Sequence, residues 1–209
     1  MTLIDSLNRR YATKKFDPTQ ILSDTEISTL LESFRLSPSS FGLQPRKCLV
    51  ITDKEIRKSL LPHSWNQEQV VDASHLLVLC AKKDLWPDDI EHFVSSIASQ
   101  RATDVWSLEW YKKMMLWHNQ WLTDEQKKQR AQKQVYIAQW FVLFAAATME
   151  IDACPMEWFS PAEYDRILWL EWSWYTATIV IPVWKRDASD PYATIAKVRY
   201  PEKEVIQRM

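Results

Sequence analysis

The sequence predicts one α+β domain over residues 1–209, and three observations support this class. One segment has the apolar spacing of a surface helix, three short segments have the composition of buried strands, and helical sequence separates them. No repeat, low-complexity tract or linker divides the chain. With 46% hydrophobic residues, a chain of this length can bury a substantial core.

Residues 24–36 (DTEISTLLESFRL) are expected to form an amphipathic helix. Their first turn is acidic, as helix N-termini prefer, and the apolar residues at helical spacing are Ile27, Leu30, Leu31 and Phe34. Residues 125–150 begin polar and become apolar nearly all round, which predicts a long helix whose second half is buried in a core or an interface. Residues 88–124 are charged and aromatic by turns, and we interpret them as helices that project from the core.

Three short segments are expected to be buried strands. They are residues 48–52 (CLVIT), 76–80 (LLVLC) and 176–183 (TATIVIPV). Each is rich in leucine or β-branched residues and is bounded by polar or turn-forming residues, as strands covered on both faces are.

The charge balance argues against nucleic acid or an anionic membrane as a partner. The 26 basic and 27 acidic residues give a formal net charge of -1, so no net field attracts a polyanion. The first residues, MTLIDSLNRRYATKKF, lack the unbroken apolar region of a secretory signal. The longest apolar run, near residues 135–147, is interrupted by Gln139 and is too short to span a bilayer. We therefore expect a cytoplasmic protein.

Cysteine and histidine indicate neither a disulfide framework nor a metal site. Cys48, Cys80 and Cys154 are odd in number and widely spaced without a C-x-x-C motif, which favours reduced thiols in the core. No metal is expected, because the histidines make no ligand-spaced pair with these cysteines; they are His63, His75, His92 and His118.

Gly42 is the only glycine in the chain. Neither a P-loop nor a G-x-G-x-x-G motif can therefore be written, and side chains and helix ends would have to hold any bound phosphate. Basic residues suited to this task stand near both ends of the sequence. RRYATKK supplies Arg9, Arg10, Lys14 and Lys15, and KVRYP supplies Lys197 and Arg199, spaced to point to one side of an extended segment.

Seven segments resemble, in order and with near-normal spacing, the FMN-dependent NAD(P)H nitroreductase family, in particular its oxygen-insensitive nitroreductase and dihydropteridine reductase group. They are RRYATKKFD, SPSSFGLQP, NQEQVVDASHLLVLCAK, KQVYIAQ, AAATMEIDACPMEWF, RILWLEWSWYTATIVIPVW and KVRYP. The resemblance covers nearly the whole chain. It implies a nitroreductase-like fold, with a central mixed, mainly antiparallel sheet flanked by helices, in an intertwined homodimer.

The resemblance also implies a non-covalent FMN site. The residues that would line the phosphate, ribityl chain and pyrimidine edge are Arg10, Tyr11, Ala12, Lys14, Lys197 and Arg199. Their cationic donors suit a dianionic phosphate. Lys14 is expected beside the flavin N1 and O2 edge, where a positive group stabilises the anionic reduced flavin and raises its potential. Two positions depart from the family, since Ala12 stands where serine or threonine is frequent and Arg46 where tryptophan is common.

Three further groups would approach the flavin ring. Asn66 and Gln69 match positions that hydrogen-bond its edge, although relatives often carry lysine at the second. The other subunit would contribute Pro38, Ser39 and Ser40, because in this family each FMN lies across the dimer interface. The turn that would lie against the flavin face away from the substrate, with a backbone N–H near N5, comprises Pro155, Met156, Glu157 and Trp158.

The implied activity is that of an FMN-dependent NAD(P)H oxidoreductase. No catalytic side chain is expected, because the chemistry takes place on FMN, and Lys14 and the backbone of Glu157 only tune it. NADH or NADPH would give hydride to the flavin, and a nitroaromatic, quinone or pteridine-like acceptor would then take the same place in ping-pong fashion. The side chains suited either to cover this face or to plain packing are Tyr111, Met114 and Met115.

Two kinds of alternative remain open at this point. Relatives of the same fold carry out reductive dehalogenation, enone reduction or flavin fragmentation. A protein of a different class, a non-catalytic flavin-binding or structural homodimer, would follow if Trp158 blocked the site.

The tryptophans are unusual in number and position. There are 12, and residues 167–184 (ILWLEWSWYTATIVIPVW) place several of them where turns are expected. Tryptophan is strained wherever a positive φ or a close backbone approach is needed. We hypothesise that UGA codons decoded as glycine in the source organism have been read as tryptophan; the alternative is a natural variant that seats tryptophan. The positions where relatives carry, or are expected to carry, glycine are Trp110, Trp140, Trp158, Trp169, Trp174 and Trp184.

Overall fold

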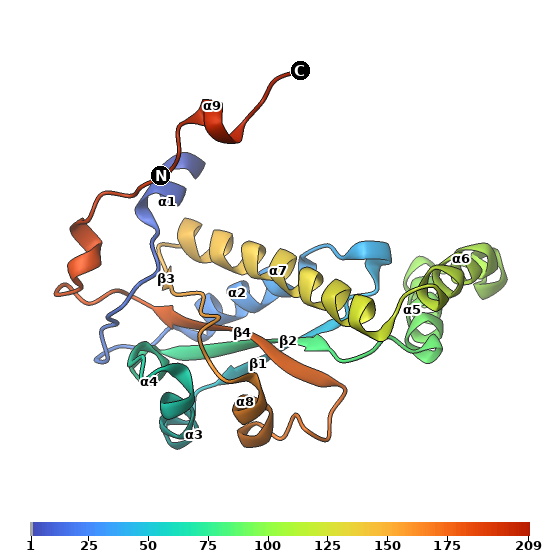
Figure 1. Ribbon diagram of the computed structural model, residues 1–209, viewed down its shortest axis with the longest axis horizontal. Coiled ribbons are helices and arrows are strands. Elements are labelled where there is room, and N and C mark those ends of the chain that lie inside the picture. Colours follow the sequence, from blue (N-terminus) through green and yellow to red (C-terminus); the bar gives the residue numbers. More distant parts are fainter. Residues whose placement is uncertain (1) are drawn as a thin grey trace.

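The computed structural model describes residues 2–209 and has one four-stranded sheet with helices on both faces (Figure 1). The helices are α1 (Leu3–Arg9), α2 (Asp24–Leu36), α3 (Lys54–Leu60), α4 (Gln69–Asp72), α5 (Pro87–Arg101), α6 (Glu109–Gln120), α7 (Asp124–Thr148), α8 (Pro161–Ile167) and α9 (Glu202–Val205). The strands are β1 (Arg46–Ile51), β2 (His75–Lys82), β3 (Asp152–Ala153) and β4 (Tyr175–Trp184). The predicted α+β class and the three predicted strands are confirmed.

The sheet has the strand order β1-β2-β4-β3, and its neighbouring strands are antiparallel. β2 and β4 form its centre, where Leu79 lies opposite Ile179 and the register shifts before Cys80. A parallel component appears in the isolated bridge between Ala12 and Ala153. That bridge joins the segment after α1 to the β3 edge of the sheet, where the candidate site lies.

The two faces of the sheet enter two separate cores, because successive strand residues point to opposite sides. The β2 and β4 residues that pack with α2 and α7 include Leu77, Leu79, Ile179 and Ile181. Those that pack with α3, α4 and α8 include Leu76, Val78, Cys80 and Val180. Burying one such side chain contributes about 1.5–3 kcal/mol. Since both faces are covered, the strands are apolar along their whole length, which made them recognisable.

α2 and α7 begin where the sequence supplies capping boxes. The Ser23 hydroxyl accepts the Glu26 N–H while the Glu26 carboxylate accepts the Ser23 N–H, and Thr123 and Gln126 do the same. These bonds satisfy N–H groups that the helix itself leaves free. α2 has the predicted bounds, and α7 ends at Thr148 rather than at the predicted residue 150.

The second half of α7 is buried on one face only. Val135, Ala138 and Val142 are fully buried against the sheet. On the opposite face an apolar stripe, here called the α7 stripe, is 37–51% exposed and comprises Tyr136, Ile137, Trp140 and Phe141. The second half of α7 is thus apolar on both faces, of which one packs in the core and the other is exposed to water in the single chain. The α7 stripe is therefore a candidate interaction surface.

α5 and α6 project from one end of the sheet, as predicted for residues 88–124 (Figure 1). A small core of Ile90, Val94 and Met115 joins the two helices, so Met115 is a packing residue. The Tyr111 hydroxyl donates to the carbonyl of Phe41 at 2.8 Å. This bond ties α6 to the short helical turn Ser40–Gly42.

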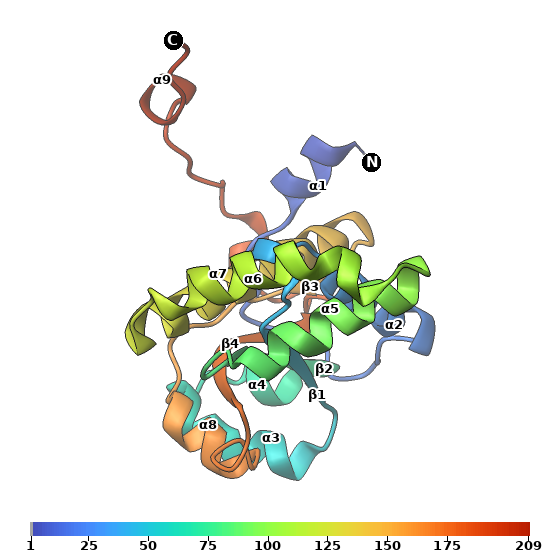
Figure 2. The same ribbon diagram turned by 90° about the vertical axis from the view of Figure 1, so that its right-hand side faces the viewer.

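The two terminal segments project together from another side of the molecule (Figure 2). The tail after β4 leaves apolar side chains 54–84% exposed, namely Ile195, Val198, Tyr200, Val205 and Ile206. Within residues 2–209, no helix combines the length and the apolarity needed to cross a bilayer.

The tryptophans lie almost entirely at the surface. Eleven of the 12 have exposed fractions between 48% and 92%, although tryptophan is usually among the more buried residues. Trp169 has a φ of 54°, in the left-handed region that favours glycine. Trp184 is 3% exposed, and its indole N–H has no partner among the described residues.

Strain from a positive φ or from a close approach of other groups is therefore absent at most of the tryptophan positions that relatives fill with glycine. In the single chain, four of these side chains are exposed to solvent, and the backbone at their positions has no positive φ. They are Trp110, Trp140, Trp158 and Trp174. Trp65, which is not one of the positions assigned to glycine, has a φ of 53°. These side chains stay largely exposed even where they meet another aromatic ring, as Trp158 meets Trp65 and Trp140 meets Phe144.

Candidate functional site

Two adjoining pockets lie where the ends of the chain meet the β3 edge. The first, called the cationic pocket, has a volume of about 480 Å³ and is formed by residues 8–12, Lys14 and residues within 192–199. The second, called the turn pocket, has a volume of about 370 Å³ and is formed mainly by residues 154–158. Lys14 lines both pockets.

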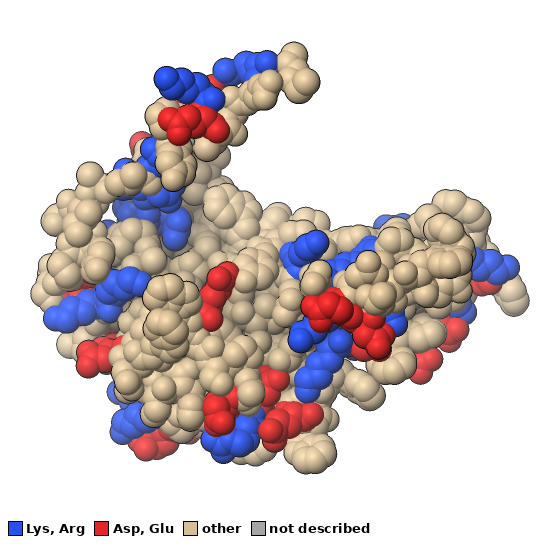
Figure 3. Space-filling view, in the orientation of Figure 1, with Lys and Arg blue, Asp and Glu red and all other residues tan. Residues whose placement is uncertain are grey.

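Arg10, Lys197 and Arg199 converge on the cationic pocket. Figure 3 shows a group of Lys and Arg atoms at the base of the projecting termini. Within residues 2–209, none of the three forms an ion pair with a carboxylate. Burial and the nearby Arg199 lower the pKa of Arg10, and burial, Arg10 and Arg199 lower the pKa of Lys197. Like charges gathered without a counterion form a site for an anion.

Lys197 also shapes this pocket. Its ammonium donates to the carbonyl oxygens of Leu7 and Arg10, at the C-terminal end of α1. Helix ends leave such carbonyls free, and a cation there is favourable. Lys197 thus fixes the C-terminal segment to α1. Arg199 donates to the carbonyl of Val198 at 2.6 Å and has further N–H groups for a ligand.

The turn pocket is built on a segment fixed to the sheet. The N–H of Met156 donates to the Val180 carbonyl at 2.8 Å, and the N–H of Val180 donates back at 3.1 Å. Among the described residues, the backbone N–H groups of Glu157 and Trp158 have no acceptor, so they are free to bond to a ligand.

Lys14 and Cys154 meet at the junction of the two pockets. The Lys14 ammonium lies 3.7 Å from the Cys154 sulfur, and the Gln69 amide lies 3.8 Å from the same atom. Burial raises the pKa of the Cys154 thiol above its ordinary value. The thiol is therefore neutral at physiological pH, and it leaves the charge of Lys14 available to a ligand.

Polar and aromatic groups contact Glu157 and Trp158 of the turn pocket. The Tyr136 hydroxyl donates to Oε1 of Glu157 at 2.6 Å, which links the α7 stripe to the turn. Burial and this bond raise the pKa of Tyr136 to about 12. The Gln67 amide donates to the Trp158 carbonyl at 3.3 Å, and the ring of Trp158 lies 4.7 Å from that of Trp65.

Tyr11 contacts a network of charged residues in which the two aspartates are buried and the arginine is partly exposed. The Arg186 guanidinium lies over its ring at 4.5 Å and donates to Oδ2 of the buried Asp152 at 3.0 Å. Asp190 accepts the Tyr11 hydroxyl at 3.0 Å. Burial and the bond to Asp190 raise the pKa of Tyr11 to about 12, so the phenol stays neutral.

The structure brings most of the predicted site residues together. The cationic pocket contains Arg10, Tyr11, Ala12, Lys14, Lys197 and Arg199. The turn pocket contains Lys14, Pro155, Met156, Glu157 and Trp158. Asn66 and Gln69 line neither pocket: Asn66 is exposed with a φ of 52°, and Gln69 is buried behind Cys154. Gln67, between them, lines the turn pocket instead.

The turn that was predicted to reach the flavin of the other subunit lines neither pocket of its own chain. It comprises Pro38, Ser39 and Ser40. α7 holds this turn firmly. The N–H of Ser40 donates to Gln134 at 2.8 Å, and Arg130 donates to the Ser40 hydroxyl at 2.6 Å.

Sequence reasoning missed several residues of the site. Cys154, expected as a plain core residue, is buried but also lines the turn pocket. Gln67 and Gln139 line the same pocket. Asp190 was missed as well, although an Asp-Pro pair that caps a turn is a recognisable signal.

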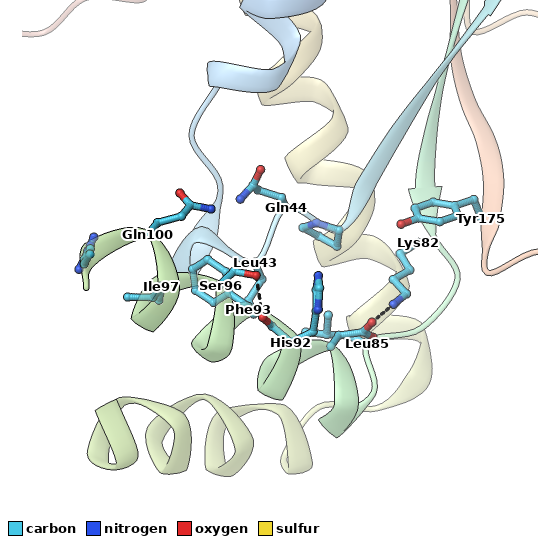
Figure 4. A pocket seen from close by; sticks show the side chains of 13 residues that line it. Leu43, Gln44, Lys82, Leu85, His92, Phe93, Ser96, Ile97, Gln100 and Tyr175 are labelled. Carbon is cyan, nitrogen blue, oxygen red and sulfur yellow. Dashed lines mark hydrogen bonds and ion pairs between the residues drawn. The ribbon is translucent and has the colours of Figure 1, made fainter. Parts of the chain in front are cut away.

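A separate cavity of about 460 Å³ lies between α5 and the segment Leu43–Pro45 (Figure 4). Its two cationic side chains are Lys82, which pairs with Asp89, and Arg101, which is exposed. The predicted site residues are not among those that line it. The cationic and turn pockets are therefore the stronger candidate for a site that binds an anionic ligand.

Comparison with known proteins assigns the family. The family model described as the nitroreductase family matches residues 7–183. A candidate NAD(P)H nitroreductase of Staphylococcus haemolyticus is 34% identical over 172 residues, which cover 80% of this chain and 78% of that protein.

Solved structures share the fold at lower identity. A candidate nitroreductase of Bacillus subtilis has a TM-score of 0.88 at 18% identity, over 99% of this chain and 98% of that one. A candidate nitroreductase of Exiguobacterium sibiricum, in complex with FMN, has a TM-score of 0.85 at 16% identity, over 100% and 98%. By sequence and by fold, the chain belongs to the nitroreductase family of oxidoreductases.

Proposed function

We propose that the protein is an FMN-dependent NAD(P)H oxidoreductase that reduces nitroaromatic, quinone or pteridine-like acceptors. One observation carries this proposal: Arg10, Lys197 and Arg199 converge without a carboxylate partner among the described residues, next to a rigid turn with free backbone N–H groups. A phosphate fits the cations, and a planar ring fits the turn. FMN carries both groups in one molecule.

The cationic pocket would hold the phosphate end of FMN. Arg10 and Arg199 would donate charge-assisted hydrogen bonds, each contributing about 1.5–3 kcal/mol. Lys197 would add its charge while keeping the C-terminal segment on α1. Tyr11 and Ala12 would border the ribityl chain, since they line the same pocket.

The turn pocket would hold the flavin ring. Lys14 would place a positive charge at its pyrimidine edge, and the free N–H groups of the 155–158 turn would face the ring. When bound, FMN supplies the transfer of hydride from NADH or NADPH to an acceptor in two half-reactions. The described side chains of the pocket bind, orient and tune the cofactor, and no acid or nucleophile among them is required for the hydride step.

We also propose that the functional unit is a homodimer with a site at the subunit interface. The α7 stripe offers an exposed apolar face on the side of Tyr136, whose hydroxyl reaches the turn pocket through Glu157. The turn Pro38–Ser40 lines neither pocket of its own chain, and α7 holds it in a fixed conformation. A second copy that packs on the α7 stripe would bring this turn to the flavin.

Purified protein tests the cofactor and the activity together. We expect a yellow protein whose flavin, released by denaturation, is FMN by mass, and which oxidises NADH or NADPH when a quinone is supplied. Protein that stays colourless and takes up no FMN would overturn the proposal. Protein that binds FMN but shows no turnover would instead support the non-catalytic alternative.

A further inference from the structure

Asp190 is a buried carboxylate at the junction of the two segments that form the cationic pocket. It is 3% exposed and does not line the pocket itself. Its side chain accepts four hydrogen bonds. They come from the Tyr11 hydroxyl at 3.0 Å, the Lys14 N–H at 2.8 Å, the Lys15 N–H at 3.1 Å and the Tyr192 N–H at 2.9 Å.

These donors belong to segments that are far apart in the sequence. Three lie within Tyr11–Lys15, next to Arg10, and the fourth lies in the turn Pro191–Thr194, which leads to Lys197 and Arg199. Backbone bonds support the same junction. The Asp187 N–H donates to the Lys15 carbonyl at 3.0 Å. Asp190 thus holds both walls of the cationic pocket from behind.

We propose that Asp190 is a positioning residue for the phosphate of FMN, because it fixes the distance between the wall that carries Arg10 and the wall that carries Arg199. This inference rests on the proposed FMN site. A carboxylate beside a phosphate would repel it, so Asp190 acts through the backbone and the phenol that it holds and not by contact with the ligand.

The chemistry of the four bonds requires an ionised aspartate. Burial alone would raise the pKa of Asp190, but the N–H groups of Tyr192, Lys14 and Lys15 and the Tyr11 hydroxyl outweigh it, and the pKa lies below its ordinary value. A carboxylate has two accepting oxygens. Here Oδ2 accepts three hydrogen bonds and Oδ1 accepts one. Asparagine has one accepting oxygen and cannot reproduce this pattern.

The test measures the dissociation constants of FMN and of riboflavin, which lacks the phosphate, for the apoprotein and its variants. Asp190→Ala is expected to weaken FMN binding by at least about tenfold, as the loss of bonds to a charged group implies, and riboflavin binding by a smaller factor. Asp190→Asn should lie between wild type and Asp190→Ala. Asp187→Asn is the matched control in the same turn, because that carboxylate bonds to Ser189 at the surface.

A second measurement does not need the cofactor. The bond to Asp190 helps to raise the pKa of Tyr11 to about 12, so Asp190→Asn should lower it toward 10. Ultraviolet titration of tyrosinate detects this change, with Tyr11→Phe in both backgrounds as the reference. This readout serves also if Asp190→Ala fails to fold.

The outcomes separate the two claims. Wild type that binds FMN, together with variants at Asp190 whose FMN-to-riboflavin preference equals that of wild type, would overturn the positioning role alone. Wild type that binds no FMN would overturn the proposed function and this inference with it.

Discussion

The ammonium of Lys14 lies 3.7 Å from the sulfur of Cys154, where the cationic pocket meets the turn pocket. Burial raises the pKa of the thiol, so Cys154 is a neutral neighbour and not a counterion. Cys154 therefore does not cancel the charge of Lys14. Glu157 lines the same turn pocket, but among the described residues it forms no ion pair with Lys14. In the proposed complex the charge of Lys14 faces the flavin edge that becomes negative on reduction.

Removal of a site cation should weaken FMN binding. Lys14→Ala and Arg199→Ala are each expected to cost about 1.5–3 kcal/mol of binding free energy, the value of a charge-assisted hydrogen bond. Quenching of flavin fluorescence measures both constants. Lys58→Ala is the control, because Lys58 pairs with Glu55 on the surface of α3. Unchanged affinity in both site variants would show that the phosphate is placed wrongly.

FMN affinity should fall at alkaline pH through Lys197. Burial, Arg10 and Arg199 lower the pKa of this lysine below the ordinary 10.5. Because a phosphate binds the protonated form better, affinity is full below the lowered pKa and decreases as pH rises through it. Lys197→Met should bind more weakly at neutral pH and lose this decrease. Parallel pH profiles of wild type and variant, from flavin titrations, would contradict the role of Lys197.

The α7 stripe should hold the homodimer together. Ile137→Asp removes an apolar side chain, whose burial contributes about 1.5–3 kcal/mol, and would place an unpaired carboxylate in the interface. Sedimentation velocity is expected to show a dimer for wild type and a monomer with little bound FMN for the variant. Lys128→Asp, in the polar first half of α7, should remain dimeric. A stable folded wild-type monomer at micromolar concentration would contradict the dimer.

Replacing tryptophan by glycine at the positions that the family fills with glycine should improve dimer formation and FMN binding. Trp140 stands in the α7 stripe and Trp158 in the turn pocket, so both indoles lie where a second subunit and the flavin are proposed to bind. A protein with glycine at these two positions and at 110, 169, 174 and 184 is expected to dimerise and bind FMN better than the printed sequence. Flavin content of the two proteins, prepared side by side, decides the matter. Equal content and activity would refute the recoding hypothesis, and the gene codons test it independently.

Local signals account for the parts of the fold that the sequence predicted well. α2 has its predicted bounds because Ser23 and Glu26 form a capping box at its start. The central strands are long apolar runs because both faces of the sheet are covered. α7 was less predictable, since its exposed stripe and its core face are equally apolar in sequence.

Long-range contacts account for what was missed at the site. The Lys14 N–H donates to Asp190, which is 176 positions away in the sequence, and no local sequence pattern predicts this contact. In the segment 66–69, Asn66 and Gln69 were predicted to contact the flavin. Asn66 has a positive φ, and Gln67 lines the turn pocket instead. The basic residues at both ends were predicted to bind a phosphate, but only the fold shows that they line one pocket.

An anaerobic titration of the purified flavoprotein, followed by absorbance, tests whether its FMN passes electrons from a nicotinamide to an acceptor. In the absence of an acceptor, NADH or NADPH should bleach the bound FMN with one equivalent per flavin, and a quinone added afterwards should restore the yellow spectrum. This result would establish both half-reactions on one site, as the proposed function requires. Bound FMN that neither nicotinamide can bleach, or that stays bleached when the quinone is added, would contradict it.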